Sequence, residues 1–208
     1  MGESLSKIIS IRILKLFTGI ENNKIMVVEM RGCYSCNPKA IVEKLLQLNP
    51  SLKIIWATNQ SISDYDQFPP MIEVVNIGTY DYYYHIFSSK LIICNAMSMY
   101  YSGAKKKKNQ FLIQTWHGSL GLKRIETNSD KIWIKKTTKM SNDTDFIICN
   151  SEFEKRVYRE TFWKKNKILE FGHPRNDMLV NKSEERRKNI REVLYEKYGI
   201  DTDSRLVL

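Results

Sequence analysis

Two short segments carry residue types that can do chemistry, and each directly follows an apolar run. The first extends from Gln114 to Arg124 and contains a single histidine, His117. A neutral imidazole titrates near physiological pH, so His117 can take a proton from an attacking hydroxyl. The residues around it can bind a substrate and hold phosphate charge: Trp116, Gly118, Ser119, Lys123 and Arg124. The alternative is a tight turn with an incidental histidine.

The second segment extends from Phe171 to Asp177. Pro174 is expected to open a helix whose first turn holds Arg175, Asn176 and Asp177. Arg175 can contact phosphate with two N–H groups, and Asp177 suits the positive end of a helix. Simple capping by Asn176 and Asp177 is the alternative to chemistry. His173 can be catalytic or an incidental loop histidine.

Four cysteines raise the question of metal or redox chemistry. Cys33 and Cys36 form a CxxC, which is either a redox pair or half of a zinc site. No second CxxC and no histidine pair at ligand spacing completes such a site, so we expect no bound metal. Cys94 and Cys149 end apolar runs and are expected to be small buried residues at strand ends.

Short apolar runs alternate with helical patterns along the chain. Strands are expected at 24–30, 52–57, 72–75, 91–94, 111–114, 145–149 and 167–171, and helices at 38–48, 80–89, 132–140, 151–162 and 184–198. This alternation predicts an α/β fold, a mostly parallel sheet with helices on both faces. Both chemical segments follow strands, where such sheets place ligand sites.

The first 22 residues have a helical pattern of their own. One face carries apolar side chains and the remainder includes Lys7 and Lys15; the apolar set is Leu5, Ile8, Ile9, Ile13, Leu16, Phe17 and Ile20. Such a helix lies either in the headgroup layer of an anionic membrane or on the protein core. No apolar run reaches the roughly 20 residues that span a bilayer.

The charge is unevenly distributed. The 208 residues have a net charge of +10, with 9 basic and 8 acidic side chains in residues 1–100 against 24 and 15 in residues 101–208. An anionic partner for the second half is therefore expected. The lysine run 105–108 raises nucleic acid as a partner, but no recognised nucleic-acid-binding signature accompanies it, so none is expected.

Four segments together resemble the CDP-glycerol glycerophosphotransferases, which include the glycerol-phosphate primase and polymerase of wall teichoic acid synthesis. The segments are Asn37–Ile41, Gln114–Gly118 with Lys123, Asn150–Ser151 and Gly172–Asp177, and the resemblance extends over roughly residues 24–208. The stretch Ser119–Arg124 is one residue longer than the family pattern. The extra residue bears on the exact roles of Lys123 and Arg124 but not on the role of His117.

The resemblance implies a Rossmann-like lobe of a GT-B type transferase. Residues 1–22 would be the amphipathic helix, 23–203 the acceptor-side lobe, and 204–208 the start of a donor-nucleotide lobe. The implied reaction is attack by a hydroxyl of a lipid-linked glycerol-phosphate acceptor on the β-phosphate of CDP-glycerol, with His117 as general base and no cofactor. The remaining candidates named above would bind substrate.

The implied setting is the cytoplasmic face of the cell membrane, with the protein attached peripherally to an anionic surface. Two alternatives remain within the same resemblance. The donor can be CDP-ribitol in place of CDP-glycerol, and the chain can be an inactive fragment that binds acceptor or membrane.

Overall fold

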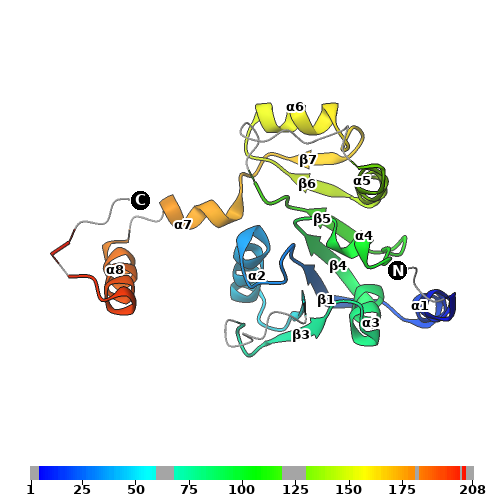
Figure 1. Cartoon of the computed structure of the whole chain (residues 1–208), viewed down its shortest axis with the longest axis horizontal. Coiled ribbons are helices and arrows are strands. Elements are labelled where there is room, and N and C mark those ends of the chain that lie inside the picture. Colours follow the sequence, from blue (N-terminus) through cyan, green and yellow to red (C-terminus); the bar gives the residue numbers. More distant parts are fainter. Residues whose placement is uncertain (1–4, 60–67, 119–129, 181–182, 202, 205–208) are drawn as a thin grey trace. The chain divides into compact units, whose positions relative to one another are not determined.

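The computed structural model describes residues 5–59, 68–118, 130–180, 183–201 and 203–204. Seven parallel strands form one sheet in the order β3-β2-β1-β4-β5-β6-β7 (Figure 1). The strands are β1 (Glu21–Val28), β2 (Lys53–Thr58), β3 (Ile72–Asn76), β4 (Ser89–Cys94), β5 (Phe111–Gln114), β6 (Phe146–Ile148) and β7 (Lys167–Leu169). The parallel α/β fold expected from the sequence is therefore confirmed.

Some of the helices connect these strands, and others precede or follow the sheet in the chain. They are α1 (Leu5–Phe17), α2 (Cys36–Leu48), α3 (Tyr80–Ser88), α4 (Ser98–Tyr101), α5 (Lys131–Asp143), α6 (Glu152–Glu160), α7 (Asp177–Val180) and α8 (Glu184–Tyr198). Contacts divide the chain into residues 1–175, which contain the whole sheet, and residues 176–208, which contain α7 and α8. The boundaries expected at residues 22/23 and 203/204 stay predictions, and residues 205–208, in the expected start of a donor-nucleotide lobe, lie outside the described residues.

The strand order reverses direction between β1 and β4. From β1 the sheet first grows through β2 to β3, and β4 then pairs with the other edge of β1, with Val28 opposite Cys94. The residues that follow both strands therefore emerge side by side at the carboxyl edge of the sheet. Open parallel sheets bind their ligands in the crevice at such a switch point.

Residues of β1 to β4 supply two separate cores, one on each face of the sheet. On β1, Met26 and Val28 face the core shared with α3, whereas Ile25 and Val27 face the core shared with α2. This is the period of two that a strand imposes on its side chains. Helices accordingly cover both faces of the sheet (Figure 1).

Helix α1 packs on the protein with residues outside its predicted apolar stripe. Ile11 and Leu14, which lie off the predicted apolar stripe, pack against the core beside α3. The stripe residues Ile9, Ile13, Leu16 and Phe17 are exposed. Among the described residues, no helix is both long and apolar enough to cross a bilayer.

Candidate active site

His117 lies three residues beyond the end of β5, at the carboxyl edge of the sheet, and is partly buried. Its Nδ1 is 2.6 Å from the main-chain carbonyl oxygen of Asn95. A carbonyl oxygen only accepts, so this hydrogen bond requires the proton on Nδ1 and leaves Nε2 of the neutral ring with its lone pair. This is the form that a general base needs.

Trp116 holds the histidine in place through an unusual backbone conformation. Its φ of 52° is in the left-handed region, which is uncommon for a residue other than glycine. The strain is offset by two contacts: its N–H donates to Oε1 of Gln114 at 2.8 Å, and its carbonyl accepts from Nδ2 of Asn37 at 3.4 Å. The Trp116 ring is buried and stacks on the imidazole of His117 at a centroid distance of 4.5 Å.

Arg175 comes from the second chemical segment and reaches the first. Its Nη1 donates to the carbonyl oxygen of His117 at 2.9 Å and lies 3.3 Å from Sγ of Cys36. Its main-chain N–H donates to Oδ1 of Asn37 at 3.3 Å. The fold thus brings together two segments that the sequence marked separately, and it places a fixed positive charge beside the candidate base.

Asn37 is the buried residue that joins the two segments. Its Nδ2 donates to the carbonyl oxygen of Thr115 at 3.1 Å and lies 3.5 Å from Nδ1 of His173. Nε2 of His173 is in turn 3.2 Å from the carboxylate of Glu154 on α6. His173, for which a catalytic and an incidental role were left open above, is therefore a buried histidine in a polar network.

A second buried pair supports His117 from the switch point. Glu29 follows β1, and its Oε1 accepts from Nδ2 of Asn95 at 3.0 Å. Oδ1 of Asn95 accepts from the N–H of Met30 at 2.8 Å. Sequence reasoning missed both residues, although a polar residue directly after an apolar strand was the available signal.

The other predicted site residues have different outcomes. Ser119, Lys123 and Arg124 lie outside the described residues. A Cβ on Gly118 would meet no described atom within 4 Å, so packing gives no reason for glycine there. Asn176 and Asp177 are exposed and belong to the second unit. The helix expected at Pro174 begins with a 3-10 turn, Pro174–Asn176, that leads into α7.

The four cysteines do not form a metal centre with other described residues. Burial raises the pKa of Cys94 to about 12 and also raises that of Cys149, so both thiols remain protonated. Both are completely buried at strand ends, as expected. Cys36 contacts Arg175 at the site, and its φ of 64° is also left-handed.

A parallel sheet covered on both faces, with its polar site at the carboxyl edge of β1, β4 and β5, defines a Rossmann-like lobe of the GT-B type of transferase. The sequence profile of the family described as CDP-glycerol:poly(glycerophosphate) glycerophosphotransferase matches residues 11–208. The chain belongs to this family.

Individual relatives agree with this assignment. The teichoic acid poly(glycerol phosphate) polymerase of Staphylococcus epidermidis is 31% identical over 160 residues, which are 72% of this chain and 22% of the relative. The polymerase of the same name from Bacillus spizizenii is 26% identical over 203 residues, 90% of this chain and 49% of the relative. The chain thus spans about half the length, or less, of these curated relatives.

Solved structures share the fold. The structure of the wall teichoic acid polymerase TagF is 25% identical, with a TM-score of 0.73, and the match covers 90% of this chain and 48% of the polymerase. A variant of TagF soaked with CDPG is 24% identical, with a TM-score of 0.74, over 90% of this chain and 50% of the other.

Proposed function

We propose that this chain carries the base-bearing lobe of an enzyme that transfers glycerol phosphate from CDP-glycerol to an acceptor hydroxyl in teichoic acid synthesis. The observation that carries the proposal is the hydrogen bond from Nδ1 of His117 to the Asn95 carbonyl, which leaves Nε2 able to accept a proton. The family assignment and the CDPG-soaked relative supply the donor class.

The proposed step balances as a simple displacement. The acceptor oxygen bonds to the β-phosphorus of CDP-glycerol while the bond from that phosphorus to the bridging oxygen breaks, and CMP leaves. The hydroxyl proton passes to Nε2 of His117. Arg175, 2.9 Å from the His117 carbonyl, adds a positive charge near the place where negative charge gathers.

The test is release of CMP from CDP-glycerol with a lipid-linked glycerol-phosphate acceptor. It is run with this chain and with any longer polypeptide that its gene encodes, because the chain spans about half of its relatives. We expect His117→Ala to lower turnover by about 100-fold or more, which is the usual contribution of a general base. Lys139→Ala, at an exposed position on α5, is the matched control.

Retention of near-normal turnover by a folded His117→Ala variant would remove His117 from the mechanism. Parallel reactions with CDP-ribitol identify the donor. Binding of acceptor without CMP release from any of these polypeptides would favour the alternative of an inactive acceptor-binding fragment.

We further propose that α1 attaches the protein to an anionic membrane, where a lipid-linked acceptor would be found. Leu16 and Phe17 are 80% and 84% exposed, and Ile9 and Ile13 about half exposed, although all four are apolar. Arg12 is exposed on the same helix. Apolar side chains with a flanking cation suit the headgroup layer of such a membrane.

Sedimentation with phosphatidylglycerol vesicles tests the attachment. Changing both Leu16 and Phe17 to Ser is expected to reduce the bound fraction several-fold, because the apolar area that enters the lipid is lost. Leu48→Ser is the matched control, since Leu48 is an apolar residue on α2 that is 71% exposed. Equal effects of the two changes would argue against a specific role for α1.

A further inference from the structure

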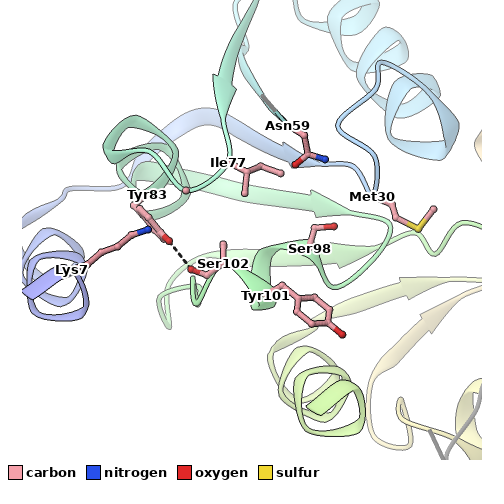
Figure 2. Close-up of a pocket in the computed structure, with 9 residues that line it drawn as sticks. Lys7, Met30, Asn59, Ile77, Tyr83, Ser98, Tyr101 and Ser102 are labelled. Atoms are coloured by element: carbon pink, nitrogen blue, oxygen red, sulfur yellow. Dashed lines mark hydrogen bonds between the residues drawn. The ribbon is translucent and has the colours of Figure 1, made fainter. Parts of the chain in front are cut away.

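A pocket of about 410 Å³ opens at the carboxyl edge of the sheet (Figure 2). Its walls come from α1, from α3 and α4, and from the segments that follow β1, β2 and β3. The volume lies within the range of about 300–1,000 Å³ that is usual for small-molecule sites. None of the predicted site residues lines it, so the mechanism proposed above does not use it.

The pocket lies at the switch point of the sheet. Met30, which follows β1, and Ser98, which begins α4 after β4, both line it. The N–H of Met30 donates to the side chain of Asn95, whose main-chain carbonyl holds His117. A ligand in the pocket therefore touches Met30, which is bonded to the residue that supports the candidate base.

The lining suits an anionic polyol. It offers an ammonium group from Lys7, a hydroxyl group from Ser98 and the amide of Asn59, beside the apolar side chains of Met30 and Ile77. None of the nine residues described as lining the pocket is Asp or Glu. Hydroxyl and amide groups pair with the hydroxyls of a polyol, and an ammonium group pairs with phosphate.

Lys7 links the pocket to the exposed side of α1. Its Nζ is 5.9 Å from the centre of the Tyr83 ring, and its side chain extends toward the pocket in Figure 2. The hydroxyl of Tyr83 donates to the carbonyl oxygen of Ser102, another residue of the lining. One helix thus supplies both a cation to the pocket and the exposed apolar residues Leu16 and Phe17.

We propose that this pocket binds a glycerol phosphate unit of the acceptor, with Nζ of Lys7 paired to its phosphate and Ser98 and Asn59 to its hydroxyls. The inference rests on the proposed transferase function for the identity of the polyol. It adds a place for the acceptor outside the His117 loop. The pocket residue Met30 is connected to that loop through Asn95, which accepts from Met30 and from His117.

The test is a titration of the ¹⁵N-labelled chain with a synthetic dimer of glycerol phosphate, followed by two-dimensional NMR. The dimer is expected to shift the amide signals of Met30, Gly78 and Ser98, whereas glycerol and inorganic phosphate shift them at least fivefold less at equal concentration. Lys7→Gln is expected to weaken dimer binding at least fivefold, and Lys7→Arg to retain it. The matched control is Arg12→Gln, which removes the same charge from an exposed position on α1 outside the lining.

Three results would overturn the proposal. They are equal weakening by Lys7→Gln and Arg12→Gln, equal shifts with inorganic phosphate, and shifts confined to residues outside the pocket. A separate arm uses phosphatidylglycerol vesicles, whose headgroup is itself a glycerol phosphate: loss of vesicle binding in Lys7→Gln without any shift by the dimer would assign the pocket to lipid instead. No donor is present and no turnover is measured, so a failure here is distinct from a failure of the proposed reaction.

Discussion

Asn95 connects the switch point of the sheet to the candidate base. Its side chain donates to Glu29 and accepts from Met30, while its main-chain carbonyl faces Nδ1 of His117. The other carboxylate oxygen of Glu29 accepts from the N–H groups of Arg31 and Cys33, at 2.6 and 3.2 Å. Glu29 and Asn95 are both buried, so we expect Glu29 to be a positioning residue that acts on His117 through Asn95.

Glu29→Gln tests this positioning. An amide NH2 replaces one carboxylate oxygen and cannot accept, so at least one of the donors to Glu29 loses its acceptor, which costs about 1–3 kcal/mol of stability. We expect turnover to fall about tenfold through misplacement of the imidazole. We also expect the ¹⁵N spectrum of His117 to change from a single Nδ1–H form to a mixture of tautomers.

Glu43→Gln, on the exposed side of α2, controls for loss of a carboxylate. The tautomer is the decisive readout, because a purely structural loss of stability would leave it unchanged in the folded fraction. A single Nδ1–H form in the Glu29 variant would contradict the positioning role.

The residues of the site differ in how far the sequence reveals them. His117, Trp116 and Arg175 were predictable, because their chemical types are informative by themselves and they follow apolar strands. Asn37 appeared only as part of a family motif, and Glu29 and Asn95 were not selected at all. Their roles depend on partners as far as 138 residues away in the chain, and local pattern does not contain such pairings.

At the scale of elements, Glu21 fastens the start of β1 to β2. Its two carboxylate oxygens accept from Lys24 at 2.9 Å and Lys53 at 2.8 Å. The hydrogen bond from Lys53, and then that from Lys24, lowers the pKa of Glu21 to about 2. The ammonium group of Lys24 is itself almost fully buried, so Glu21 is also its counter-ion.

The lowered pKa predicts a change in stability on the acid side. A carboxyl group whose pKa is lower in the folded protein stabilises it above the unfolded pKa, near 4.5, and this stabilisation is lost as the pH falls toward 2. Glu21→Gln is therefore expected to be less stable than the parent at pH 6, with a difference that shrinks at pH 4 and again at pH 3. Urea denaturation at each pH measures it, and a difference independent of pH would contradict the assignment.

The lysine run 105–108 shows why charge alone is a poor guide to an element. Lys105 pairs with Asp143 at 3.3 Å and Lys106 with Asp145 at 3.1 Å. Lys107 donates to the carbonyl oxygen of Thr18, just beyond α1. Three of the four lysines therefore form ion pairs or hydrogen bonds with other residues of the chain. This weakens the case for a surface that binds the phosphates of a nucleic acid.

For the molecule as a whole, the sequence predicts the class of fold but not its arrangement. The seven expected strands coincide with β1–β7 to within a few residues, because strands buried on both faces are nearly continuous apolar runs. The strand order and the switch point between β1 and β4 depend on pairing between distant segments. Helix α4 has only four residues, too few to show a helical period.

The arrangement of the site also has a consequence for the order in which the chain folds. Asn37 must meet Thr115, which is 78 residues away, and His173, which is 136 residues away. Contacts of such high contact order form slowly, because the entropy of closing long loops is lost before the contacts form. A ribosome releases His117 long before Arg175, so the nascent chain lacks the contact from Arg175 to the His117 carbonyl until β7 has docked. The complete set of contacts around His117 is thus a late marker of folding, formed only when almost the whole sheet exists.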